Sequence, residues 1–189
     1  KTEGRYVAVH DDDDTWHPDF LARTVEVLEG DDDLGGVAVR THIIWEKFDE
    51  SGALVETGRE PFLPKQTGLF LSDLLVHNRW VPISFLFRRS LVAMHGSFRD
   101  DLPVVGDWDY HLRLMAAGVR IAFLADEPLA YWHQRPGLGG VDGNSVIASR
   151  DLHRHFDLAL RDEHIRAYVK ERGLGLPLLI AESSSGHVP

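Results

Sequence analysis

Four consecutive aspartates, Asp11 to Asp14, are the residues of this chain whose types and spacing most clearly suggest chemistry. They follow a short apolar run over residues 6–9, and Pro18 opens an amphipathic stretch after them. The pattern predicts a buried strand, an acidic turn and a helix, and ligands bind at the carboxyl ends of strands in open α/β sheets. Carboxylates this close together repel one another unless a cation lies among them, and oxygen ligands favour Mg²⁺, Mn²⁺ or Ca²⁺. An acidic run is also typical of a solvated turn, so the pattern alone leaves both interpretations open.

The bulk composition limits the classes of protein that can be considered. The chain has 189 residues with 43% hydrophobic and 26% charged residues, which is ordinary for a globular domain. Its net charge of −10 argues against a general nucleic-acid binder, which would show a basic face. The absence of cysteine excludes disulfide and thiolate chemistry and fits a cytoplasmic location. No apolar run approaches the ~20 residues of a membrane span, and because the first residue is Lys1 rather than Met we expect the chain to begin inside a longer protein or after processing.

The elements that must position the aspartates alternate between strands and helices, which predicts an α/β layered sheet. Expected strands cover residues 5–10, 35–48, 53–57, 82–88, 119–124 and 128–133. Expected helices cover residues 18–29, 69–78, 91–95, 107–117 and 145–172. Residues rich in Gly and Pro predict loops over 58–68 and 136–144. We therefore expect one domain over residues 1–172, followed by a loose tail over 173–189.

Several stretches of the sequence, taken in order, resemble the family 2 glycosyltransferases with the GT-A fold. They are GRYVAVHDDDDTWHPDFL, ISFLFRRSLVAMHGSFRDDLPVVGDWDYHLRLMAAG, VRIAFLADEPLAYWHQR and GNSV, and together they cover about residues 4–148. The resemblance implies a three-layer mixed sheet of the nucleotide-diphospho-sugar transferase type. It also implies a metal-dependent, inverting, hexosyltransferase-like enzyme that transfers a sugar from a nucleotide-diphosphate sugar to a hydroxyl of a carbohydrate or other acceptor. Such an enzyme would act in the synthesis of surface polysaccharides or natural products.

The resemblance assigns the donor side of the site to the acidic turn and to the end of a later strand. Asp11, Asp12 and Asp13 match the D-x-D motif: Asp11 would lie near the ribose, and Asp13 would bind Mn²⁺ or Mg²⁺ on the sugar diphosphate. Asp12 belongs to the same nucleotide-sugar site, and Asp14 would support the turn or the donor sugar. A metal there would neutralise charge on the diphosphate leaving group.

Two further residues, His133 and Arg135, end a strand that should finish near the metal. His133 could bind the metal or a phosphate, although a single histidine is as often packed or at the surface. Arg135 could hold the diphosphate through its planar guanidinium, or it could be a solvated arginine at the mouth of a loop.

The acceptor side is assigned to the helix expected over residues 107–117. Asp107 matches the general base of the family, although Gly106 replaces the acid that precedes it there. Asp is also a favoured helix N-cap, and Asp107 would occupy that position. Trp108 and Trp132 flank the proposed site, where they could stack on a sugar or belong to the core. For Arg113 we expect internal pairing with carboxylates.

The family carries additional β-α units, including the residue that reads the nucleotide base, before the point that matches Gly4. We therefore expect this chain alone to bind nucleotide sugars poorly and to be inactive by itself. The sheet would keep an open edge or face, and a second copy of the chain or the C-terminal helix would cover it. The alternative function is a non-catalytic carbohydrate- or partner-binding module that retains the fold. A metal-dependent phosphohydrolase would need histidines at fixed spacing, which the sequence lacks.

Overall fold

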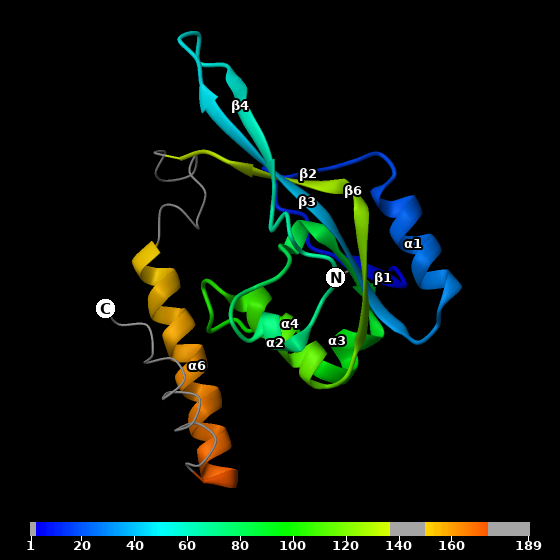
Figure 1. Cartoon of the computed structure of the whole chain (residues 1–189), viewed down its shortest axis with the longest axis vertical. Coiled ribbons are helices and arrows are strands. Elements are labelled where there is room, and N and C mark those ends of the chain that lie inside the picture. The colour runs from blue at the N-terminus through cyan, green and yellow to red at the C-terminus, as the bar shows by residue number, and fades with distance from the viewer. Residues whose placement is uncertain (1–2, 137–149, 174–189) are drawn as a thin grey trace. The chain divides into compact units, whose positions relative to one another are not determined.

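The computed structural model describes residues 3–136 and 150–173 of the chain. The chain divides into two compact units, Lys1–Ala148 and Ser149–Pro189, whose elements are labelled in Figure 1. The described part of the second unit is the helix α6, Arg150–Arg172, which agrees with the helix expected up to residue 172. The expected glycine-rich loop from residue 137 onward and the tail from residue 174 lie outside the described residues, and the domain limits stay a prediction.

A mixed sheet organises the first unit. Its strands follow the order β1–β5–β3–β6–β2, and β4 pairs with β3 beside this path. Only β3 and β6 run parallel to each other, and the other described strand pairs are antiparallel. The strands are β1 (Tyr6–Ala8), β2 (Thr15–Trp16), β3 (Leu34–Phe48), β4 (Leu54–Pro61), β5 (Phe85–Arg88) and β6 (Arg120–Gln134). This arrangement confirms the predicted α/β class with a mixed sheet.

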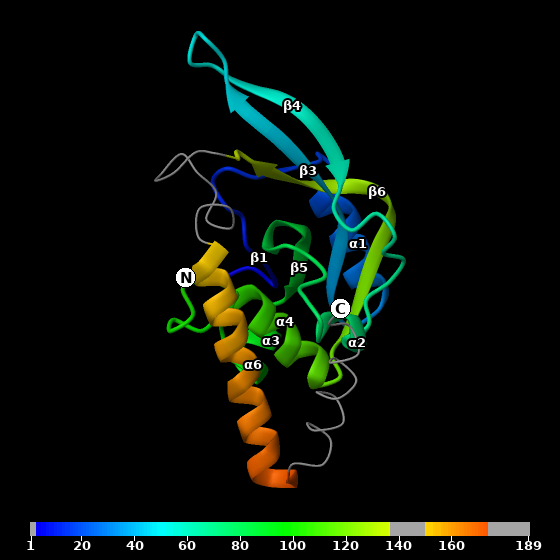
Figure 2. The same cartoon turned by 60° about the vertical axis from the view of Figure 1, so that its left-hand side comes forward.

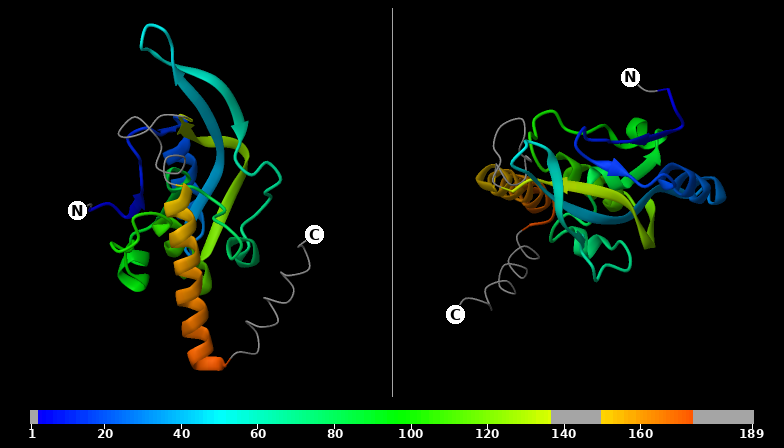
Figure 3. Two further views of the ribbon diagram at one scale, coloured as in Figure 1. Left: turned by 90° about the vertical axis from the view of Figure 1, so that its left-hand side faces the viewer. Right: turned by 90° about the horizontal axis from the view of Figure 1, so that it is seen from above.

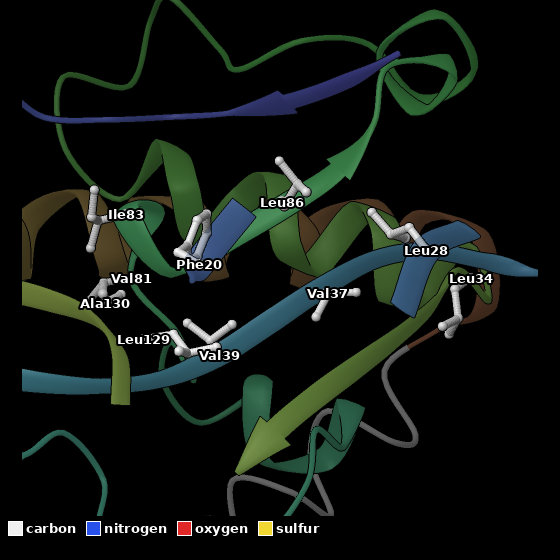
Figure 4. Packing of buried hydrophobic residues seen from close by; sticks show 10 residues of the cluster. All are labelled: Phe20, Leu28, Leu34, Val37, Val39, Val81, Ile83, Leu86, Leu129 and Ala130. Carbon is white, nitrogen blue, oxygen red and sulfur yellow. The ribbon is translucent and has the colours of Figure 1, made fainter. Parts of the chain in front are cut away.

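One face of the sheet packs against the helix α1, Phe20–Gly30. Figure 4 shows side chains from this helix and from the strands directed into one apolar cluster. The fully buried members include Phe20 and Leu28 from the helix and Val37 from β3. Since each buried Leu or Phe side chain stabilises a fold by roughly 1.5–3 kcal/mol, this cluster holds the strands behind the acidic turn in place.

The opposite face packs against the helix α4, Gly106–Ala116. Successive side chains of a strand point to opposite faces, so Leu86 enters the α1 cluster while Phe85 and Phe87 face α4. Phe87 lies 5.4 Å from the ring of Tyr110, and Phe85 lies 5.4 Å from the ring of His111. Helices on both faces of a central sheet give the expected three layers.

Short helical elements lie between β4 and α4 in the chain. They are the helix α2 (Leu71–Leu74), the 3₁₀ turn η1 (Pro82–Ser84) and the helix α3 (Ser90–His95). The strand predicted from residue 82 therefore begins only at Phe85, and α2 is shorter than the helix predicted over 69–78. The backbone N–H of Ser84 donates to the carbonyl of Val81, which closes the turn before the strand begins.

Strands β3 and β4 form a long hairpin that projects beyond the remaining strands in Figures 1, 2 and 3. The prediction of a loop from residue 58 was wrong, because β4 pairs with β3 as far as Pro61 opposite His42. Gly58 lies opposite Trp45 at the register shift of the hairpin, which is a usual place for glycine inside a strand.

The two strands predicted over 119–124 and 128–133 are one continuous strand, β6, with an irregularity between them. Arg40 from β3 fills this irregularity, where its Nε donates to the carbonyl of Ala125 at 2.6 Å. A side chain from the neighbouring strand thus satisfies the backbone where the ladder is interrupted, so the strand continues to Gln134.

Candidate functional site

The acidic turn lies between β1 and β2, and the short strand β2 determines what the turn faces. Thr15 and Trp16 pair with Tyr131 and Ala130 of β6, which brings the turn beside the carboxyl end of β6. Trp16 stacks on Phe20 with 4.3 Å between ring centroids. Its indole N–H also donates to the carbonyl of Ile83 at 2.6 Å. These contacts anchor the turn to α1 and to the segment before β5.

Asp14 is the buried member of the acidic run, with 4% of its surface exposed. Its Oδ1 accepts a hydrogen bond of 2.9 Å from the backbone N–H of His133. Burial raises the pKa of Asp14 to about 7, and the charges of Asp13 and Asp11 add to the effect against the opposing hydrogen bond. Asp14 therefore supports the turn from within, which is one of the two roles predicted for it.

Both ring nitrogens of His133 contact protein atoms. Its Nδ1 lies 2.8 Å from Oε1 of Glu46, and its Nε2 lies 2.8 Å from Oγ1 of Thr15. An ionised carboxylate only accepts hydrogen bonds, so Nδ1 carries a proton and donates to Glu46. The Thr15 hydroxyl occupies Nε2 in this arrangement, and the role of His133 as a metal ligand stays a prediction.

Glu46 also holds Arg135, and the sequence analysis did not single out Glu46. Its Oε2 accepts from Nε of Arg135 at 3.1 Å, and Nη1 of the same arginine lies 3.9 Å from Oδ2 of Asp13. The side chains of Glu46 and Arg135 are 11% and 15% exposed, so this ion pair is largely withdrawn from solvent. Of the two alternatives for Arg135, the solvated arginine does not fit this burial, and its guanidinium faces the acidic turn. The sequence signal that could have indicated Glu46 is that it is the one acidic residue in the largely apolar strand β3.

Asp11 and Asp12 are exposed, and the side chain of Asp13 is 29% exposed. Loss of hydration, followed by the charges of Asp13 and Asp12, raises the pKa of Asp11 above 3.8. The described residues contain no group of three or more His, Asp or Glu side chains arranged to hold a metal ion. Oxygen donors that repel one another nevertheless suit a hard divalent cation, and the partly exposed Asp13 carboxylate is the predicted metal ligand among them.

Asp107 belongs to a second polar cluster on α4. The helix begins at Gly106 after Val105, so Asp107 lies in the first turn and is not the N-cap. Its Oδ2 accepts a hydrogen bond of 2.7 Å from Nδ2 of Asn78. In turn, Oδ1 of Asn78 lies 3.0 Å from Nδ1 of the buried His111. A partly buried carboxylate with a fixed amide partner can serve as a base.

Internal ion pairing fixes the same helix to the segment before it, as predicted for Arg113. Its Nε donates to Oδ2 of the buried Asp109 at 2.8 Å. Its two terminal nitrogens donate to the carbonyls of His95 and Ser97. The first turn of α4, which carries Asp107, is therefore held against the chain that follows α3.

The two tryptophans proposed for sugar stacking are packing residues in this structure. Trp108 is 5% exposed and donates its indole N–H to the carbonyl of Leu74 at 2.8 Å, so its ring is not available to a sugar. Trp132 packs against the α1 cluster, and Phe62 lies against it edge-on at 5.7 Å. Both positions favour the core interpretation that the sequence left open.

The mixed α/β fold is consistent with the GT-A type of glycosyltransferase fold. Residues 1–93 of the 189 match the model of the family described as glycosyl transferase family 2, which supports a family 2 glycosyltransferase fragment. The matched stretch contains the four aspartates and Glu46 and ends before Asp107. At the family level the activity is glycosyl transfer from a nucleotide-sugar donor to an acceptor.

A search among curated proteins found no match to the chain. Among the helices of the described residues, none is long and apolar enough to cross a membrane.

Proposed function

We propose that the full-length protein catalyses metal-dependent, inverting transfer of a sugar from a nucleotide-diphosphate sugar to an acceptor hydroxyl. One observation carries the proposal: Arg135 is held by Glu46 against Asp13 of the acidic turn. A cation that faces an acidic turn suits a diphosphate and its metal, because Asp13 would hold the metal and the guanidinium of Arg135 would bind phosphate oxygens.

On the donor side, Asp13 would hold Mn²⁺ or Mg²⁺, and Asp11 would contact the ribose. Asp12 lies at the exposed rim of the same turn, where it would face the donor nucleotide. The metal would supply charge neutralisation for the diphosphate leaving group. Arg135 would bind that group directly, and Asp14 would keep the turn in shape through its bond to the backbone of His133.

On the acceptor side, Asp107 would act as the general base. The acceptor hydroxyl oxygen forms a bond to the anomeric carbon while its proton passes to the carboxylate of Asp107. The bond from the anomeric carbon to the diphosphate oxygen breaks, and the nucleoside diphosphate leaves with that electron pair. A single displacement of this kind inverts the anomeric configuration.

The test uses the full-length protein and measures release of nucleoside diphosphate together with the anomeric configuration of the product. General-base catalysis contributes about 10²–10⁴-fold, so Asp107→Asn should lower kcat by at least about 100-fold. Asp101→Asn is the matched control, because Asp101 is exposed and pairs with Arg99. Full transfer activity in Asp107→Asn would overturn the base assignment, and a product with retained configuration would overturn the inverting mechanism.

If the wild-type protein binds carbohydrate but neither transfers nor hydrolyses the donor, the non-catalytic binding module is the better interpretation. The cytoplasmic location, the homodimer that covers an open sheet, and a role in polysaccharide synthesis stay predictions.

A further inference from the structure

The side-chain amide of Asn78 can have only one orientation. The backbone N–H of Arg79 donates to one terminal atom of this side chain at 3.0 Å, so that atom is the oxygen Oδ1. The other terminal atom is then the NH₂ group, which lies 2.7 Å from Oδ2 of Asp107 and donates to it. The amide therefore presents a hydrogen-bond donor, and not an acceptor, to the candidate base.

A buried histidine supports the same orientation. His111 is 1% exposed and stacks on Trp80 with 4.2 Å between ring centroids. Burial lowers its pKa to about 3, so the ring is neutral near pH 7 and carries a single proton. Its Nδ1 lies 3.0 Å from Oδ1 of Asn78, which can only accept, so the proton is on Nδ1. The hydrogen bonds thus run in one direction, from His111 to Asn78 and from Asn78 to Asp107.

We propose that Asn78 is a positioning residue for the transfer reaction, which fixes the rotation of the Asp107 carboxylate about its Cβ–Cγ bond. The proposal rests on the proposed function, in which Asp107 is the general base. A carboxylate that rotates freely presents its basic lone pairs in many directions, whereas one held by a directed donor presents them in one. Misplacement of a reacting group by about 1 Å can cost roughly 100-fold in rate, so this orientation matters for kcat.

The isosteric variant Asn78→Asp separates positioning from a purely structural role. Its carboxylate still accepts from the N–H of Arg79 and from Nδ1 of His111, so the contacts that hold residue 78 are retained. It cannot donate to Asp107. We therefore expect kcat of the full-length enzyme to fall about 10- to 100-fold, while KM for donor and acceptor changes less than about two-fold. Ser72→Asp is the matched control, because it adds the same charge at an exposed position of α2 and should keep kcat.

Thermal stability measures the contact independently of activity. In Asn78→Asp two carboxylates face each other, so Tm should fall. In the double variant Asn78→Asp with Asp107→Asn, the amide at position 107 can donate to the carboxylate at position 78, and most of the lost Tm should return. This double-mutant cycle isolates the pairwise interaction between the two residues.

The outcomes distinguish the two proposals. A loss of kcat in Asn78→Asp with unchanged KM and a positive coupling in Tm support the positioning role. If Asp107→Asn abolishes transfer while Asn78→Asp keeps full kcat, or if the Tm cycle shows no coupling, the positioning role is overturned and the base assignment stands. If Asp107→Asn itself keeps full transfer activity, the proposed base is overturned and the positioning role falls with it.

Discussion

At the scale of single residues, Glu46 is the acid that orients two side chains beside the acidic turn. Its two oxygens engage His133 and Arg135, so one carboxylate sets both the tautomer of the imidazole and the direction of the guanidinium. A partner behind a binding residue of this kind typically matters for affinity, because it keeps the first side chain in the productive orientation. The Asp13 carboxylate lies 3.9 Å from Nη1 of Arg135, so the arginine contacts two acids.

Replacing Glu46 by Gln should weaken donor binding more than it slows the chemical step. The amide of Gln can accept one hydrogen bond, but it carries no charge to hold Arg135. We expect KM for the nucleotide sugar to rise by about 10-fold or more, since second partners of binding groups typically contribute 10–100-fold. Steady-state kinetics of the full-length enzyme measures this. Glu50→Gln, in the exposed turn of the β3–β4 hairpin, is the control and should behave as wild type. An unchanged donor KM in Glu46→Gln would contradict the role of Glu46.

His111 gives the protein a defined dependence of stability on pH. Its pKa is about 3 in the folded protein and 6.5 when unfolded, so between these values only the unfolded state binds the proton. The free energy of unfolding should therefore decrease as the pH falls from about 6.5 toward 3. His111→Asn cannot titrate, so it should be less stable than wild type at pH 8 and should close part of that gap at pH 5.

Urea denaturation at both pH values measures this difference. The exposed His164 supplies the control, because His164→Asn should follow the wild type at every pH. A gap between wild type and His111→Asn that stays constant with pH would show that His111 titrates normally in the folded protein.

At the scale of elements, the pairing of strands determines which side chains lie near the acidic turn and α4. The two residues of β2 pair with β6, and this pairing turns the acidic run toward Glu46 and Arg135. On the other side, β5 can approach β3 closely because Gly36 has no side chain. A Cβ at Gly36 would lie 2.5 Å from the ring of Phe85 and 3.3 Å from the carbonyl of Leu86. This close approach lets the ring of Phe85 reach His111 of α4.

Gly36→Ala should therefore destabilise the fold, although alanine is a better strand residue than glycine. The added methyl group displaces the ring of Phe85 or separates two strands, and overpacking of this kind costs about 1–3 kcal/mol. The free energy of unfolding from urea titration measures the loss. Gly30→Ala is the matched control, because a Cβ there meets nothing within 4 Å. Equal stability of the two variants would contradict the close packing of β3 and β5.

For the whole molecule, the accumulated negative charge at the acidic turn creates a requirement for a cation. Arg135 supplies one positive charge for the run of residues 11–14, and Glu46 shares that charge. Burial raises the pKa values of Asp11 and Asp14, and the repulsion between neighbouring carboxylates adds to this effect. A family 2 glycosyltransferase that binds a nucleotide diphosphate must add further negative charge at this place.

Divalent metal should stabilise the protein through Asp13 and support its activity. A ligand that binds only the folded state raises Tm with concentration, so Mn²⁺ should raise the Tm of wild type and not that of Asp13→Ala. Chelation should abolish transfer by the full-length enzyme, and added Mn²⁺ or Mg²⁺ should restore it. Asp32→Ala is the control, because Asp32 is an exposed member of the other acidic run, at residues 31–33. A metal response that survives in Asp13→Ala would contradict the assignment of Asp13.

The amino-acid sequence alone was enough for the alternation of strands and helices, the acidic turn after β1 and the resemblance to family 2 glycosyltransferases. These features are local, because they depend on apolar periodicity, on glycine and proline positions, and on motifs within short stretches. The periodicity also predicted α1 and α4 closely, since each helix buries one face that carries large apolar side chains. Arg113 was assigned correctly for the same reason, because its partner Asp109 lies one helical turn away.

Only the tertiary structure decided which side chains meet. Glu46 and Asn78 reach Arg135 and Asp107 across 89 and 29 residues of sequence, and no local pattern indicates such partners. The folded chain brought the two ring nitrogens of His133 against Glu46 and Thr15, and the packing of α4 buried Trp108. The physical reason is that hydrogen bonds and burial depend on strand register and on close packing between distant segments, which are properties of the folded chain.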